Sequence, residues 1–210
     1  MADTAHHLIA ILRGVRPNEI EKITITLIER GFRAIEVTLN SPDPFSSISK
    51  AVKIAKDMVG ESALIGAGTV LCKDDVDGVV HVGGNLIVSP NCNPEVIRYS
   101  ASAGMVTFPG VFTPTEAFQA LDNGASAIKI FPASTLGPSG ISAMTAVLPK
   151  ATKIYAVGGI DAADFASYSH VGTFGFGLGS CLYRAGMSAE DVGANADRLM
   201  AAQKALRPSR

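Results

Sequence analysis

The amino-acid sequence predicts an α/β protein in which one (β/α)8 TIM barrel domain spans residues 1–210. Eight short apolar segments alternate with segments that have the sequence signals of helices, which favours a parallel sheet covered by helices. The length of 210 residues is close to the lower limit of about 200 residues for this barrel. A doubly wound open sheet is the alternative architecture.

A weak internal repeat marks where most of the strands begin. A glycine stands five residues before a distinctive residue, with an apolar run between, at Gly31, Gly84, Gly104, Gly124 and Gly172. A glycine can end a helix in the left-handed conformation, after which the chain turns directly into a buried strand. The expected strands are Leu8–Leu12, Arg33–Val37, Leu64–Ala67, Leu86–Val88, Met105–Phe108, Ala127–Ile130, Ile154–Val157 and Thr173–Phe176.

Helix signals precede these glycines. Pro17 and Pro94 stand at helix starts, Thr113 and Glu116 have the spacing of a capping box, and Ser188 is the expected N-cap of the last helix. Apolar residues recur at helical spacing within these segments. The expected helices cover residues 17–30, 41–58, 94–103, 113–123, 140–148, 161–169 and 188–208.

Composition excludes several classes of function. Hydrophobic residues make up 47% of the chain, the formal net charge is −1, and there is no basic cluster for binding nucleic acid. Three widely spaced cysteines form no metal-binding or redox motif, which favours a reduced, cytoplasmic setting. No signal peptide or membrane span is expected. His6 and His7 have no third ligand nearby in sequence, so no metal site is expected there.

Lys129 is unusual because it stands in the middle of an apolar strand. Alternation along that strand puts Ala127, Lys129 and Phe131 on one face, and Ile128 and Ile130 on the other. Burial disfavours the charged form of a lysine, and a neutral amine is the nucleophile that Schiff-base chemistry requires. The alternative is a lysine that reaches solvent or pairs with a carboxylate.

Polar and special residues follow the expected strands at their C-terminal ends, where the active site of such a barrel lies. Lysine, glutamate and arginine therefore converge on one rim. The residues at these ends are Arg13, Glu36, Thr69, Pro90, Pro109, Lys129, Gly158, Gly159, Gly177, Gly179 and Ser180.

Two of these loops are rich in glycine. Gly158 and Gly159 follow the seventh expected strand, and Gly179 and Ser180 follow the eighth. Exposed backbone N–H groups and a helix N-terminus at this place can hold a phosphate group.

Lys129, Glu36 and Arg13 form a consistent chemical set. A neutral lysine attacks a ketone and forms an iminium, which accepts the electrons of a neighbouring carbon–carbon bond. Glu36 can act as the base and later as the acid, directly or through water, and Arg13 can orient it or stabilise an anion. The alternatives are a salt bridge at Glu36 and simple acid pairing at Arg13.

The sequence resembles the bacterial 2-keto-3-deoxy-6-phosphogluconate and 2-keto-3-deoxy-6-phosphogalactonate aldolases from about Leu8 to Arg184. The motifs that carry the resemblance are IAILRG (9–14), IEVTLNSP (35–42), IGAGTVL (65–71), SPN (89–91), FPG (108–110), IKIFP (128–132) and VGG (157–159). The resemblance implies a metal-free class I aldolase without a cofactor, usually a homotrimer, acting on a small phosphorylated 2-keto-3-deoxy sugar acid. It implies that Lys129 is the Schiff-base lysine, Glu36 the acid and base, and Arg13 a positioning arginine. It also assigns Thr69 and Pro90 to the pyruvate end, and Gly158, Gly159, Gly179 and Ser180 to phosphate binding.

Two positions favour the phosphogalactonate branch of that family. Asn40 and Val157 stand where the phosphogluconate branch commonly has arginine and threonine. We therefore expect cleavage of 2-dehydro-3-deoxy-6-phosphogalactonate, with Asn40 and Val157 as substrate-binding residues. The alternatives are the phosphogluconate epimer or 4-hydroxy-2-oxoglutarate as substrate, a phosphosugar isomerase or synthase, and a non-catalytic sugar-phosphate-binding barrel.

Overall fold

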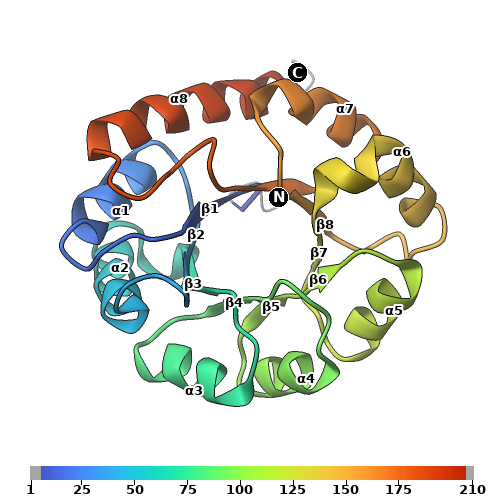
Figure 1. The fold of residues 1–210 in the computed structure, drawn as a ribbon, viewed down its shortest axis with the longest axis horizontal. Helices are drawn as coiled ribbons and strands as arrows, with labels where there is room; N and C mark the ends of the chain where they lie inside the picture. Colours follow the sequence, from blue (N-terminus) through green and yellow to red (C-terminus); the bar gives the residue numbers. More distant parts are fainter. Residues whose placement is uncertain (1–5, 207–210) are drawn as a thin grey trace.

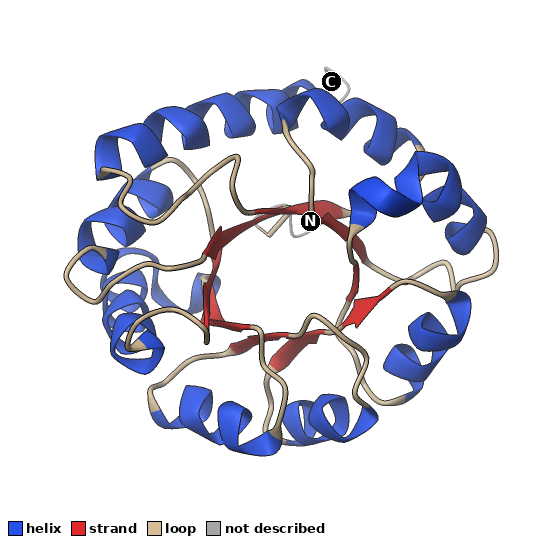
Figure 2. Cartoon of the chain, in the orientation of Figure 1, coloured by secondary structure: helices blue, strands red, loops and turns tan. Residues whose placement is uncertain are grey.

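The computed structural model describes residues 6–206, and these form a ring of parallel strands surrounded by helices (Figures 1 and 2). The expected barrel class is confirmed, and the open doubly wound sheet is not. The strands follow the order β5-β4-β3-β2-β1-β9-β8-β7-β6. Their bounds are β1 Leu8–Leu12, β2 Ala34–Thr38, β3 Leu64–Gly68, β4 Leu86–Val88, β5 Val106–Phe108, β6 Gly110–Val111, β7 Ile128–Ile130, β8 Ile154–Val157 and β9 Gly175–Leu178.

The fifth expected strand is longer than predicted and is divided in two at Pro109. β5 pairs with β4, and β6 pairs with β7. Proline has no N–H group to donate to a neighbouring strand, but its carbonyl oxygen accepts a hydrogen bond from the Lys129 backbone N–H at 2.9 Å. The continuous stretch through Pro109 therefore closes the ring, and eight expected strands become nine.

The helices cover the outside of the ring and agree with the expected ones in most places. The prediction missed α3, whose sequence KDDVDGVVH has few apolar residues and a glycine; the Asp75 side chain stabilises its first turn by accepting hydrogen bonds from the N–H groups of Leu71 and Cys72. The bounds are α1 Ile20–Glu29, α2 Pro44–Val59, α3 Lys73–His81, α4 Pro94–Ser102, α5 Pro114–Asp122, α6 Ala133–Thr145, α7 Phe165–His170 and α8 Ala189–Ala205.

Two further helices were predicted with the wrong first residue. α6 begins at Ala133 rather than near residue 140, and it contains a kink at Gly137, which has φ +71° and precedes Pro138. The single helix expected over residues 161–169 is instead a short 3-10 helix, Ala162–Asp164, followed by α7. The predicted end of the last helix, near Pro208, lies outside the described residues.

The side chains inside the barrel form a plug beneath the rim. Phe108 and Tyr155 stack with ring centroids 4.9 Å apart, and apolar side chains from the other strands pack around them. Ala127 lies in this inner cluster, whereas Ile128 and Ile130 belong to the cluster between strands and helices. The predicted alternation of β7 is therefore confirmed, and it directs Lys129 into the barrel.

In the described part of the chain, none of the helices is long and apolar enough to cross a membrane.

Candidate active site

A cavity of about 620 Å³ opens at the C-terminal ends of the strands, directly above the inner plug. Its wall includes nearly all of the residues that the sequence singled out. They are Arg13, Glu36, Thr69, Pro90, Lys129, Val157, Gly158, Gly159, Gly179 and Ser180. Asn40, which was also expected to bind substrate, is exposed and does not line this cavity.

Lys129 and Glu36 enter the cavity from different sides of the ring, on β7 and β2. The Lys129 residue is 7% exposed and Glu36 is 2% exposed. Glu36 Oε2 has no hydrogen-bond partner within residues 6–206, and no ion pair joins it to Lys129 there. A buried carboxylate oxygen without a partner is costly, and groups of this kind are concentrated at functional sites, which makes Glu36 a candidate site residue.

Burial shifts the pKa values of both groups toward their neutral forms. Burial raises the pKa of Glu36, while the charges of Lys129 and Arg13 act to lower it. Burial lowers the pKa of Lys129, the charge of Glu36 raises it, and the charge of Arg13 lowers it further. The net result is an amine that gives up its proton more easily than an ordinary lysine and a carboxyl group that keeps its proton more readily.

Arg13 extends from the end of β1 to the rim of the cavity. Its Nη1 donates a hydrogen bond to Asn40 Oδ1 at 2.8 Å. Asn40 therefore contacts Arg13, which lines the cavity, but Asn40 itself does not reach the space that a ligand would fill.

Thr69 lies on the wall in a strained conformation. Its φ of +62° is in the left-handed region, which a β-branched residue adopts rarely. Strain of this kind costs roughly 1–3 kcal/mol and is concentrated at functional sites. The strain at Thr69 therefore supports its assignment to the site.

The two glycine-rich loops leave backbone donors open. Gly158 and Gly159 have φ of +94° and +73°, and a Cβ at Gly159 would collide with the Ser134 side chain. Within residues 6–206, the N–H groups of Gly159, Ile160 and Ser180 form no hydrogen bond. All three residues line the cavity, so these donors are available to an anion.

The expected helix N-terminus at these loops is not found. A three-residue 3-10 helix follows β8, and after β9 a turn in which Gly179 O accepts from the N–H groups of Leu182 and Tyr183 precedes α8. An anion here would therefore bind to loop N–H groups rather than to the end of a long helix.

The sequence analysis missed several residues of the wall. Arg184 lines the cavity, and its Nε donates to Ser180 O at 3.2 Å. Phe131 lies with its ring centroid 4.8 Å from Lys129 Nζ, and Asp161 and Tyr183 also face the cavity. Phe131 had been expected on the same strand face as Lys129, whereas the only sequence signal for Asp161, Tyr183 and Arg184 was their position two to four residues after the glycine loops.

Among the described residues, no group of three or more His, Cys, Asp or Glu side chains is placed to hold a metal ion.

Comparison with known proteins gives one consistent family. The family model described as KDPG and KHG aldolase matches residues 3–197. A Rhizobium meliloti (strain 1021) protein, named a probable 2-dehydro-3-deoxy-6-phosphogalactonate aldolase, is 56% identical over 95% of this chain and 92% of its own. The Escherichia coli (strain K12) 2-dehydro-3-deoxy-6-phosphogalactonate aldolase is 49% identical over 87% of each chain. A solved structure titled "Native KDPGal structure" superposes with a TM-score of 0.90 and 45% identity, covering 95% of each chain.

Proposed function

This chain belongs to the KDPG and KHG aldolase family, and we propose that it cleaves 2-dehydro-3-deoxy-6-phosphogalactonate to pyruvate and D-glyceraldehyde 3-phosphate. The relatives named for this substrate support the choice. The observation that carries the chemistry is the pair of buried side chains, Lys129 and Glu36, that share one cavity and have no ion pair between them in the described chain.

In the first stage Lys129 forms the covalent link. Its neutral amine attacks the C2 ketone, giving a carbinolamine. Glu36 in its protonated form donates a proton to the departing hydroxyl group, so that water leaves and an iminium remains. The raised pKa of Glu36 and the lowered pKa of Lys129 favour this starting state, in which the acid holds the proton and the amine is free.

In the second stage the same carboxylate acts as a base. The iminium is positive and favours ionised Glu36, which then removes the proton of the C4 hydroxyl group. The C3–C4 bond breaks, its electrons form an enamine, and the aldehyde product leaves. Glu36 returns its proton to C3, and water hydrolyses the iminium to release pyruvate. The iminium is itself the electron sink, so the proposed chemistry requires no metal or cofactor.

The remaining wall residues have binding roles in this proposal. Arg13 supplies a positive charge for the substrate carboxylate or for Glu36, and Asn40 orients the guanidinium through the hydrogen bond at 2.8 Å. Thr69 and Pro90 contact the pyruvate end. Val157 lies near the hydroxyl group that distinguishes the two epimers.

The phosphate group has its own subsite in this proposal. It binds the open N–H groups of the loops that contain Gly158, Gly159, Gly179 and Ser180, which are joined here by the N–H of Ile160. Arg184 adds a positive charge at this end of the cavity.

We further propose that the protein is a homotrimer in the cytoplasm. The three cysteines, Cys72, Cys92 and Cys181, are free thiols, which fits a reduced compartment. Sedimentation equilibrium of the purified protein tests the trimer, and a monomer at micromolar concentration would contradict it.

The substrate is tested by comparing kcat/KM for the C4 epimers. We expect a higher kcat/KM for the phosphogalactonate compound. We expect Val157→Thr to reduce the ratio of the two kcat/KM values, because threonine would offer a hydrogen-bond partner to the C4 hydroxyl group of the phosphogluconate epimer. Equal or inverted preference in the unaltered protein would contradict the substrate assignment. Turnover that survives Lys129→Ala would contradict the mechanism itself.

A further inference from the structure

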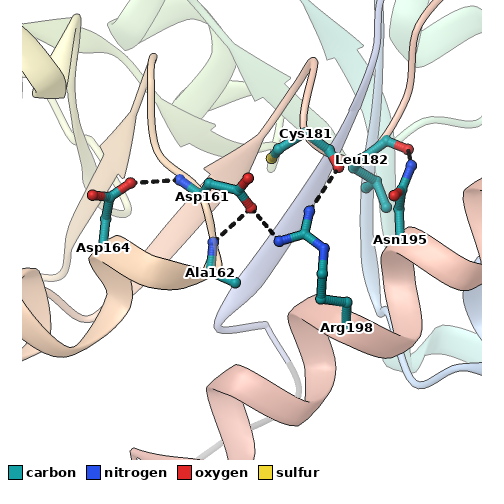
Figure 3. Close-up of polar contacts among 7 residues, drawn as sticks. All are labelled: Asp161, Ala162, Asp164, Cys181, Leu182, Asn195 and Arg198. Carbon is teal, nitrogen blue, oxygen red and sulfur yellow. Dashed lines mark hydrogen bonds and ion pairs between the residues drawn. The ribbon is translucent and has the colours of Figure 1, made fainter.

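One side chain on α8 joins the two loops at the phosphate end of the cavity. Arg198 Nη1 donates to Asp161 Oδ1 at 2.6 Å, and Arg198 Nη2 donates to the carbonyl oxygen of Cys181 at 3.3 Å (Figure 3). Asp161 follows Gly159 by two residues, and Cys181 directly follows Ser180. One planar guanidinium therefore spans the segments that carry the open N–H groups.

The contacts of Arg198 are part of a larger network behind the cavity. Asp161 Oδ1 also accepts from the Ala162 N–H at 2.6 Å, and the Asp161 N–H donates to Asp164 Oδ2 at 2.8 Å. Asn195, one turn before Arg198 on the same face of α8, donates from Nδ2 to the Leu182 carbonyl at 3.1 Å (Figure 3). Two successive carbonyl groups of the last loop are thus held by one helix face.

The charge of Asp161 needs a partner at this place. Asp161 is one of the residues that line the cavity, and its carboxylate would repel a phosphate bound nearby. Burial acts to raise the pKa of Asp161, but the hydrogen bonds from Arg198 and from the Ala162 N–H hold it below its usual value. Asp161 therefore stays ionised, and the Arg198 guanidinium offsets its charge.

We propose that Arg198 is a positioning residue for the phosphate group of the substrate. It fixes the distance between the Gly158–Asp161 and Gly179–Leu182 loops from behind, so that their N–H groups converge on one anion. The proposal depends on the proposed function in one respect, namely that these loops bind phosphate. A lysine cannot replace this arginine fully, because an ammonium is a point charge and lacks the rigid fork that reaches two acceptors.

The test measures phosphate binding directly and separately from turnover. The dissociation constant of inorganic phosphate is measured by calorimetry for the unaltered protein, Arg198→Met and Arg198→Lys. In parallel, the addition of pyruvate to D-glyceraldehyde 3-phosphate is compared with its addition to unphosphorylated D-glyceraldehyde. The matched control is Asp197→Asn, because Asp197 is the neighbouring α8 residue and pairs at 3.4 Å with Arg30, which directly follows α1, away from both loops.

We expect Arg198→Met to raise the phosphate dissociation constant and the KM for the phosphorylated aldehyde by roughly tenfold, since small displacements of binding groups have large effects. The constants for the unphosphorylated aldehyde should stay within about twofold, Arg198→Lys should be intermediate, and Asp197→Asn should bind phosphate normally. Thermal unfolding of each variant controls for folding.

Unchanged phosphate binding in Arg198→Met, or an equal loss of binding in Asp197→Asn, would overturn the proposal. Full recovery of binding when Asp161→Asn is added to Arg198→Met would overturn it too, because it would assign the effect to charge alone. Absence of phosphate binding in the unaltered protein would also overturn it. By contrast, phosphate binding without cleavage of either epimer would contradict the proposed function. The role of Arg198 would still be tested by the phosphate dissociation constants of the variants.

Discussion

The carboxyl group of Glu36 lies against the bare Cα of Gly68 on the neighbouring strand. A Cβ at Gly68 would stand 2.8 Å from both Glu36 Cδ and Oε2, and 2.9 Å from Oε1. Real Cβ atoms do not approach other atoms this closely, so the glycine provides the space in which the carboxyl group faces the cavity. Gly68 therefore acts on the site through Glu36.

Replacement of Gly68 by alanine should displace the Glu36 side chain and leave the barrel folded, because all three of the nearest atoms belong to that one side chain. We expect kcat to fall roughly 100-fold, the scale of a 1 Å misplacement of a reacting group. Gly66→Ala is the contrasting variant, since a Cβ there would collide with the backbone of Leu86. It should lower the thermal unfolding temperature far more than Gly68→Ala. A fully active Gly68→Ala enzyme would show that the position of Glu36 is not critical.

The pH dependence of Schiff-base formation should shift in opposite directions in two variants. Lys129 must be neutral to attack, so the rate of pyruvate trapping should fall as the pH drops below its pKa. The charge of Glu36 raises this pKa and the charge of Arg13 lowers it. Glu36→Gln should therefore move the decline to lower pH, and Arg13→Met should move it to higher pH. Shifts in the same direction, or none at low ionic strength, would contradict this electrostatic account.

The buried pair should reduce the stability of the fold. Lys129 and Glu36 are both desolvated and are not joined by an ion pair in the described chain. Their replacement in Lys129→Met/Glu36→Gln should raise the free energy of unfolding at neutral pH by about 1–3 kcal/mol, the cost of a buried polar group that lacks a partner. Urea denaturation measures this quantity. A double variant that is less stable than the unaltered protein would indicate that the pair stabilises the barrel.

The barrel could be predicted from sequence because its signals are local. Glycines that end helices and short apolar strands indicated seven of the eight helices, and alternation put Lys129 on the strand face opposite Ile128 and Ile130. α3 was missed because it contains few apolar residues and a glycine, and only Val76 and Val79 are buried. The division at Pro109 depends on how two different neighbouring strands pair with one segment, which no local pattern contains.

The candidate site was predictable where residues stand at strand ends and unpredictable where it depends on helix contacts. Arg13, Glu36 and Lys129 line one cavity as expected. Asn40 does not line the cavity; its side chain accepts a hydrogen bond from Arg13, which does. The bridge from Arg198 joins α8 to residues 37 and 17 positions earlier in the chain, and a charge pattern within one helix cannot specify such partners.

The most direct test of the account is borohydride reduction of the protein in the presence of pyruvate, followed by peptide mass mapping. The account predicts one added pyruvyl group on the peptide that contains Lys129, and no adduct in Lys129→Ala. An adduct on another lysine, or no adduct in the active enzyme, would contradict the assignment of Lys129 as the nucleophile.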